Sequence, residues 1–280
     1  MRDCFCGWYF KCQNAAQTLA VIPAYHITNG QRSCSIQVIT DDHSWNITFP
    51  YSAYRQRKKG VEIGGNYFGQ DGIRLNLHEP VSVVGSLSFG PFTPLQYDIM
   101  GPFKYIPFME CRHSVFSMHH RVNGSLEVDG VAYQFYRGVG YMEGDRGTSF
   151  PKQYIWTQCT LPEGALMLSV ADIPFGGFCF TGVICAIHWQ GREYRLATYL
   201  GARAVRIHDG EVVICQGRRQ LTVRRLEKKG HPLAAPSRGN MSRTIHETAS
   251  CRAYYQLVDS GRTIFACEVG NAAFEYEYSV

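Results

Sequence analysis

Apolar and polar residues alternate with a period of two along much of the chain. The clearest stretches are residues 35–40, 82–89, 113–120 and 263–269. Because successive side chains of a strand point to opposite faces, this alternation predicts strands with one buried face. Helical periodicity is scarce, and its best candidate, residues 14–20, is short enough to be a loop or turn. The pattern therefore predicts an all-β protein.

Turn-forming dipeptides separate the alternating stretches. Each lies between apolar runs and pairs a polar residue with glycine, as two-residue hairpin turns require. They are Asn29-Gly30, Asn123-Gly124, Asp129-Gly130, Gln190-Gly191 and Asp209-Gly210. The spacing of the second and third dipeptides predicts a short strand at residues 125–128 between two turns.

An aromatic strand start occurs twice along the chain. Residues 8–13 (WYFKCQ) resemble residues 154–159 (YIWTQC). Each copy is followed by a loop, an apolar strand and then a tryptophan in a polar segment, Trp45 in the first and Trp189 in the second. Duplication of a β-unit would give this pattern.

Two such β-units could each form a closed, stable sheet. A curved antiparallel sheet can close on itself and remove its edges, and a barrel of about eight strands encloses one small ligand. We therefore expect two antiparallel β-barrel or sandwich halves in tandem, at residues 1–138 and 139–280. Each half has an ordinary domain size.

Composition excludes several classes of protein. No run of eighteen apolar residues occurs and the first residues lack the pattern of a signal peptide, so we expect no membrane span and a cytoplasmic location. The net charge of +5 is concentrated at residues 218–229, which alternate with apolar residues like the solvated face of a strand. We therefore expect no nucleic-acid partner.

Cofactor motifs are missing from the sequence. Eleven cysteines, an odd number, are spread along the chain without a C-x-x-C pair, which favours reduced, buried thiols. The histidines lack the close spacing of strand metal sites, and neither a phosphate loop nor a dinucleotide fingerprint is present. We expect no metal and no cofactor.

Three segments carry a resemblance to a known family. Residues 141–159 (YMEGDRGTSFPKQYIWTQC) resemble the signature of the tocopherol cyclase family, with an acidic residue, a Gly, a Phe-Pro pair, a Trp and Gln-Cys. Residues 7–11 (GWYFK) resemble the opening strand of the family. Residues 232–236 (PLAAP), with Gly239 and Met241, are similar to its late loop.

The resemblance implies a tandem lipocalin-like fold and an acid-catalysed reaction. The activity for which the family is named closes a chroman ring by protonating a prenyl double bond beside a phenol, without a cofactor. The chain departs from the plant-type pattern at Arg146, where those enzymes have Trp. Arginine would suit an anionic or carbonyl-bearing ligand, which points to a substrate other than the precursor of tocopherol.

The acidic part of the signature supplies the candidate catalytic residues. If residues 141–145 form a strand, Tyr141, Glu143 and Asp145 point to one face. Burial and a neighbouring carboxylate raise a carboxyl pKa, which favours a general acid. We expect Asp145 to donate the proton, with Glu143 as the second candidate. In the alternative interpretation these residues form the end of a surface strand, and Asp145 pairs with Arg146.

The same region supplies the expected ligand-binding residues. They would shape a pocket or orient a polar group, and they are Tyr141, Arg146, Phe150, Trp156, Gln158 and His113. The resulting hypothesis is a cofactor-independent cyclase, isomerase or hydratase acting on an apolar unsaturated molecule, prenyl or aromatic, held in a β-barrel cavity. The alternative is a lipocalin-type carrier that binds a hydrophobic small molecule without catalysis.

Overall fold

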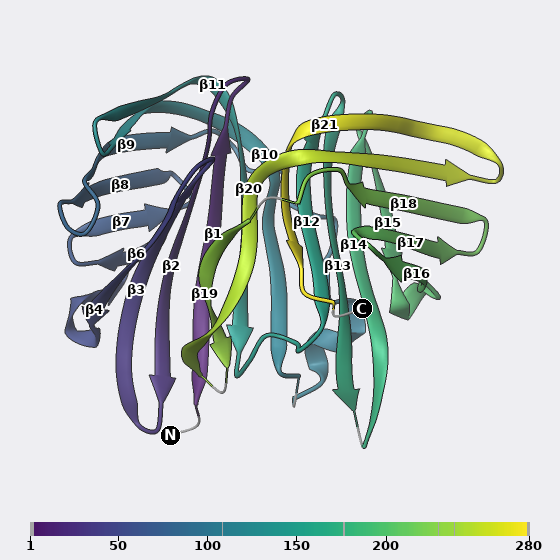
Figure 1. Ribbon diagram of the computed structural model, residues 1–280, viewed down its shortest axis with the longest axis horizontal. Coiled ribbons are helices and arrows are strands. Elements are labelled where there is room, and N and C mark those ends of the chain that lie inside the picture. The colour runs from purple at the N-terminus through teal and green to yellow at the C-terminus, as the bar shows by residue number, and fades with distance from the viewer. Residues whose placement is uncertain (1–2, 108, 176, 229, 238, 279–280) are drawn as a thin grey trace. The chain divides into compact units, whose positions relative to one another are not determined.

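The computed structural model describes residues 3–107, 109–175, 177–228, 230–237 and 239–278. Strands make up most of it, and they form two antiparallel sheets (Figure 1). The prediction of an all-β protein with two lipocalin-like antiparallel halves is confirmed. Within these residues three short 3-10 turns interrupt the strands, at Tyr51–Ala53, Gly101–Tyr105 and Thr198–Leu200. None of the helical segments in the described ranges has the length and apolar character needed to cross a lipid bilayer.

The chain folds into two compact units. Unit 1 comprises Met1–Pro94, Met109–Phe150 and Pro232–Thr244, and unit 2 comprises Leu95–Phe108, Pro151–His231 and Ile245–Val280. The predicted boundary between residues 138 and 139 falls within strand β11 of unit 1. That division of the chain stays a prediction.

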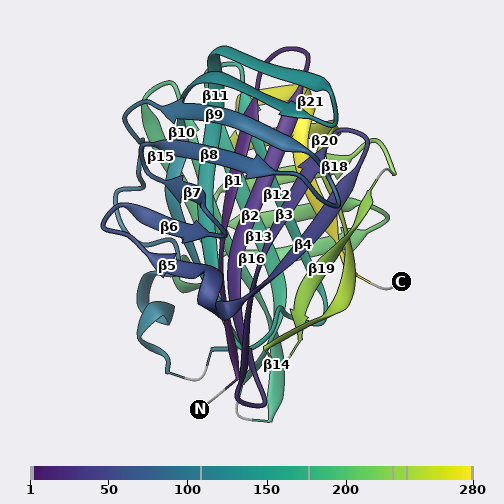
Figure 2. The ribbon, with the colours of Figure 1, turned by 90° about the vertical axis from the view of Figure 1, so that its left-hand side faces the viewer.

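The first sheet belongs to unit 1 and has eleven strands in the order β4-β3-β2-β1-β11-β10-β9-β8-β7-β6-β5. Their bounds are β1 (Cys4–Gln13), β2 (Thr18–Thr28), β3 (Gln31–Thr40), β4 (Ser44–Pro50), β5 (Tyr54–Gln56), β6 (Gly60–Ile63), β7 (Asn66–Gly69), β8 (Gly72–Leu77), β9 (Val83–Phe89), β10 (Cys111–Val128) and β11 (Val131–Gly147). In this sheet β6 to β9 run across the direction of β1 to β3 (Figure 2).

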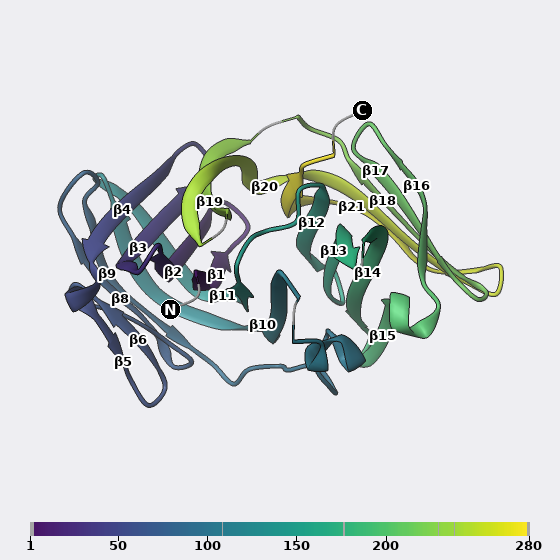
Figure 3. The ribbon, with the colours of Figure 1, turned by 90° about the horizontal axis from the view of Figure 1, so that it is seen from below.

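The second sheet has the order β15-β14-β13-β12-β21-β20-β18-β17-β16, and β19 pairs with β20. The bounds are β12 (Tyr154–Leu161), β13 (Gly164–Phe175), β14 (Phe178–Trp189), β15 (Arg192–Ala197), β16 (Arg203–His208), β17 (Glu211–Gln216), β18 (Arg219–Arg225), β19 (His231–Ser237), β20 (Asn240–Asp259) and β21 (Arg262–Tyr276). Its curvature is visible in Figure 3.

The two sheets repeat one topology. In each, four consecutive strands form a meander whose first strand pairs with the last long strand, β1 with β11 and β12 with β21. The similar segments at residues 8–13 and 154–159 lie in β1 and β12, at equivalent places. Of the two tryptophans in the repeated pattern, Trp45 lies inside β4 and Trp189 ends β14, so both belong to strands.

Each unit has its own apolar core on one face of its sheet. Unit 1 buries side chains such as Phe10, Ile36 and Met142, and unit 2 buries side chains such as Ile155 and Leu168. We call the face of each sheet that carries its core the inner face, and the opposite face the outer face. No disulfide joins any of the eleven cysteines. The expectation of buried thiols holds for five of them, Cys185 included, whereas Cys179, near the start of β14, is exposed.

Four of the five predicted glycine turns are confirmed. Asn29 and Gly30, for example, both have positive φ (51° and 78°) between β2 and β3, as a type I′ turn requires. The fifth prediction, at Asn123-Gly124, is wrong because β10 continues through it to Val128 with a register shift. A Cβ on Gly124 would lie 2.4 Å from the Ser86 carbonyl oxygen, so this glycine permits close approach of β9 within the sheet.

Candidate active site

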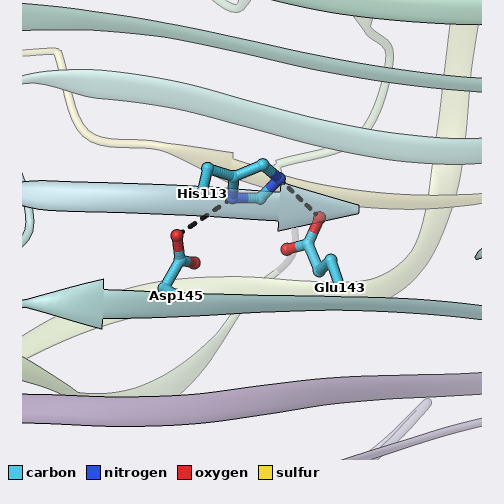
Figure 4. A group of neighbouring side chains, drawn as sticks. All are labelled: His113, Glu143 and Asp145. Atoms are coloured by element: carbon cyan, nitrogen blue, oxygen red, sulfur yellow. Dashed lines mark hydrogen bonds and ion pairs between the residues drawn. The ribbon is translucent and has the colours of Figure 1, made fainter. Parts of the chain in front are cut away.

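The pairing of β10 with β11 brings three ionisable side chains together on the outer face of unit 1. His113 lies directly opposite Asp145, and Val115 lies opposite Glu143. Directly paired residues of an antiparallel sheet project to the same face, and residues two apart share a face. His113, Glu143 and Asp145 therefore converge (Figure 4), while Met142 points to the core on the other side.

His113 lies between the two carboxylates. Its Nδ1 is 3.0 Å from Asp145 Oδ1, and its Nε2 is 3.1 Å from Glu143 Oε2. Burial opposes a charged imidazole, but the charges of Glu143 and Asp145 and hydrogen bonds to both outweigh burial and raise the pKa of His113 well above its usual value. The imidazole is therefore held as the cation, donating from Nδ1 to Asp145, with Nε2 beside Glu143.

A phenol and a lysine extend this cluster. The Tyr141 hydroxyl donates a hydrogen bond to Glu143 Oε2, and burial together with the charge of Glu143 raises the pKa of Tyr141 well above its usual value. Lys11 on β1 lies directly opposite Tyr141 and is 1% exposed. The outer face thus gathers a histidine, a lysine and two carboxyl side chains beside a phenol, an arrangement that can hold and move a proton away from bulk water.

Cys111 lies at the end of the cluster and is not a nucleophile. Its Sγ donates to Asp145 Oδ1 at 3.4 Å. Burial and the Asp145 charge raise the pKa of Cys111 well above its usual value, so the thiolate is disfavoured.

The cluster also has the composition of a metal site. One ligand atom from each of His113, Glu143 and Asp145 lies within 4.8 Å of the others. However, each imidazole nitrogen faces a different carboxylate, whereas a histidine gives a metal only one nitrogen. A cation bound by Nε2 and Glu143 would leave Asp145 on Nδ1 as an orienting carboxylate. A metal bound in this way would have two of the three side chains as ligands, whereas a shared proton would involve all three.

Of the other predicted site residues, two belong to unit 1 and two to unit 2. Arg146 is exposed, and its position in β11 places it on the inner-face side of the strand, away from Glu143. Phe150 makes an edge-to-face contact with Phe5 in unit 1. Trp156 and Gln158 belong to unit 2, where both are buried on the outer face of β12.

A second buried acidic group, which the sequence did not predict, lies in unit 2. Glu247 and Glu275 are directly opposite each other on β20 and β21 and are 1% and 7% exposed. The Tyr154 hydroxyl donates a hydrogen bond to Glu275, and Trp156 is the cross-strand neighbour of Glu275. Lys11 was not predicted either, although a lone lysine among the aromatic residues of β1 was a signal of a buried charge.

Comparison with known proteins finds similar sequences over most of the chain. A family model described as "Tocopherol cyclase-like" matches residues 77–276, which include β10, β11 and β12. The protein from Oryza sativa subsp. japonica named "Probable tocopherol cyclase, chloroplastic" is 26% identical over 121 residues. The match covers 40% of this chain and only 26% of the rice protein, about a quarter of its length.

Solved structures share the fold over nearly the whole chain. The crystal structure of AttH from Nitrosomonas europaea has a TM-score of 0.57 and 12% identity, covering 99% of this chain and 93% of that one. CghA, solved with the compound Sch210972, has a TM-score of 0.60 and 10% identity, covering 99% and 89%. At these identities the likeness concerns the fold alone.

Proposed function

The chain belongs to the tocopherol cyclase-like family, and we propose that it is a cofactor-independent, acid-catalysed cyclase or isomerase of an apolar unsaturated small molecule. The observation that carries this proposal is the position of the buried His113 imidazole within 3.1 Å of Glu143 and 3.0 Å of Asp145. Protonating a carbon–carbon double bond requires an acid shielded from water, because water would accept the proton or trap the cation.

Asp145 and His113 act as the source of the proton. Asp145 accepts the Nδ1–H of His113, which fixes the ring and leaves the Nε2 proton as the mobile one. Nε2 is within 3.1 Å of Glu143 Oε2 but has no well-aligned hydrogen bond among the described residues. A small rotation of either side chain aligns the two atoms for transfer.

Glu143 acts as the immediate acid. An apolar substrate that excludes water from the face disfavours the ion pair, and the proton then moves from Nε2 to Glu143, leaving both groups neutral. A carboxylic acid is a stronger donor than an imidazolium, since its ordinary pKa is lower. Tyr141, which donates to the same Glu143 oxygen, orients the carboxyl group and stabilises its charged form after the proton has left.

The proposed reaction returns the proton that it uses. Glu143 gives its proton to one alkene carbon, the π electrons form the new C–H bond, and the other carbon becomes a cation. A hydroxyl oxygen of the substrate attacks this cation and closes a ring, and its proton returns to Glu143. In an isomerisation the cation instead loses a neighbouring proton to Glu143. Neither route needs a cofactor.

Turnover of prenylated phenols and quinols by Glu143→Gln tests the proposal. The amide cannot donate a proton as an acid does, so we expect a loss of at least a hundredfold in kcat, consistent with the usual contribution of a general acid. Glu127→Gln is the matched control, because Glu127 is an exposed carboxylate on β10. Equal activity of Glu143→Gln and the wild type would contradict the proposal. If the wild type bound these compounds tightly and formed no product, the carrier alternative would be favoured.

A further inference from the structure

A pocket lies on the inner face of unit 1, the face of the sheet opposite the His113 cluster. A pocket of about 190 Å³ opens there between β1, β11, β10 and the β5–β7 segment. Its apolar wall is formed by Trp8, Phe10, Phe68, Phe116 and Met142. A cavity of about 150 Å³ accommodates benzene, so this pocket has room for one ring with a short substituent.

A glycine creates the space for the aromatic wall. Gly144 lies directly opposite Trp8 across the β1–β11 pair. A Cβ at Gly144 would lie 3.3 Å from Trp8 Cδ1 and 3.1 Å from Phe116 Cε2, closer than either ring would allow without moving. The absence of a side chain at this position therefore lets the two rings approach β11 and line the pocket.

The rim of the pocket is cationic. Lys58 and Lys59, in the turn between β5 and β6, line the pocket and are exposed. The preceding Arg57 is neutralised by an ion pair with Glu62, and no acidic side chain is among the described residues that line the pocket. The field at the opening is therefore positive, and it is not balanced from within.

Hydrogen bonds hold this rim in place. The Gln56 side chain donates to the Gly60 carbonyl oxygen at 2.9 Å, and the Gln70 backbone amide donates to the Lys59 carbonyl oxygen at 3.1 Å. The Arg57 backbone amide also donates to the Gly60 carbonyl oxygen at 2.9 Å. The backbone that carries both lysines is thus fixed over the aromatic wall.

From this geometry we propose that unit 1 binds a small amphiphilic carboxylate, with its ring or short chain against Trp8 and Phe116 and its anionic end at Lys58 and Lys59. The aromatic wall supplies apolar contact area, and the two ammonium groups recognise the charge. This site is separate from the proposed catalytic cluster, because Met142 and Gly144 face the pocket whereas Tyr141 and Glu143 face the other side of β11. The inference does not depend on the proposed function.

The test compares two probes of one shape, 4-phenylbutanoate and 4-phenylbutan-1-ol, by isothermal titration calorimetry on the full chain. We expect both to bind, the carboxylate about five- to tenfold more tightly at low salt, and the preference to vanish in 0.5 M NaCl, where the Debye length is only about 4 Å. Failure of both probes to bind, or equal affinity at low salt, would overturn the inference.

Two variants separate the parts of the site. In Lys58→Gln/Lys59→Gln the carboxylate preference should disappear while the alcohol still binds, whereas Lys104→Gln/Arg218→Gln, which removes two exposed charges in unit 2, should change nothing. Phe116→Trp should fill the pocket and abolish binding of both probes, with an unchanged circular dichroism spectrum. An unaltered carboxylate preference in the lysine variant would refute the role of the rim.

Discussion

Removing the Asp145 charge should change the titration of His113 in a way that can be calculated from their geometry. The two groups are 3.0 Å apart, and the Asp145 side chain is 20% exposed. With an effective dielectric constant of about 20, the charge–charge energy at this distance is about 5 kcal/mol, an upper bound that solvent reduces. A partly buried opposite charge typically changes proton affinity by roughly ten- to a thousandfold. Asp145→Asn should lower the proton affinity of His113 by that factor.

The substitution also predicts a pH-dependent change in stability. Because the folded-state pKa of His113 is raised above its ordinary value of 6.5, the stabilisation is fully present below that value and is lost as pH rises through the folded pKa. Asp145→Asn should therefore cost about 1–4 kcal/mol at pH 6, and the cost should shrink as pH rises. Urea unfolding of both proteins between pH 6 and 10 measures this difference.

Imidazole ¹⁵N NMR gives the direct assay, with His26 as an internal control. Burial lowers the pKa of His26 to about 4, and its Nε2 contacts Ser35 rather than the acidic cluster. We expect its titration to be unchanged in Asp145→Asn and in Glu143→Gln. If His113 titrated near its ordinary value in the wild type, or did not respond to either substitution, the assignment of a stored proton would be refuted.

Other outcomes follow from different parts of the structure. Burial lowers the pKa of His26 and of His120 to about 4. Each therefore contributes stability above pH 6.5 that is lost as pH falls toward 4, on the order of 3 kcal/mol per histidine. Replacing both with Gln should make the urea-unfolding midpoint nearly independent of pH between 6.5 and 4. Arg195 donates to the backbone oxygen of Tyr97 and lies 3.6 Å from the centroid of the Tyr97 ring within unit 2, so Arg195→Met should lower the unfolding free energy by about 2–4 kcal/mol and increase proteolysis of residues 95–107. Gly124→Ala should cost more than about 1 kcal/mol in the same assay, because its Cβ would meet backbone, and an Ala variant as stable as the wild type would contradict the close strand approach. Chelation with EDTA should leave turnover unchanged within twofold, whereas a loss restored by Zn²⁺ or Fe²⁺ would assign the His113 cluster to a metal.

The sequence predicted those strands and turns whose conformation depends on neighbouring residues in the chain. The alternation of apolar and polar residues predicted strands such as β3 and β9. Asn29-Gly30 forms the predicted turn, with the two positive φ values that such a turn requires. Asn123-Gly124 has the same residue types, but the neighbouring strand β9 decides its conformation, because Gly124 is needed where the backbones approach. A tertiary contact therefore overrode a local turn signal.

The candidate site was predictable only in part for the same reason. The placement of Tyr141, Glu143 and Asp145 on one face follows from spacing within one strand. His113 lies more than twenty residues away in the chain, and its position between the two carboxylates depends on the register of β10 against β11, which has three register shifts. Lys11 was missed because its place opposite Tyr141 depends on pairing between the first and last strands of the first sheet.

Deuterium incorporation during turnover in D₂O tests the central claim most directly. Glu143 would deliver a proton drawn from His113, which exchanges with solvent. Each molecule of cyclised product should therefore carry one carbon-bound deuterium, seen as a mass increase of one. The label should be at the less substituted carbon of the former double bond. Glu143→Gln should give no labelled product above the uncatalysed rate. A cyclised product formed by the wild type without carbon-bound deuterium would contradict proton transfer to the double bond.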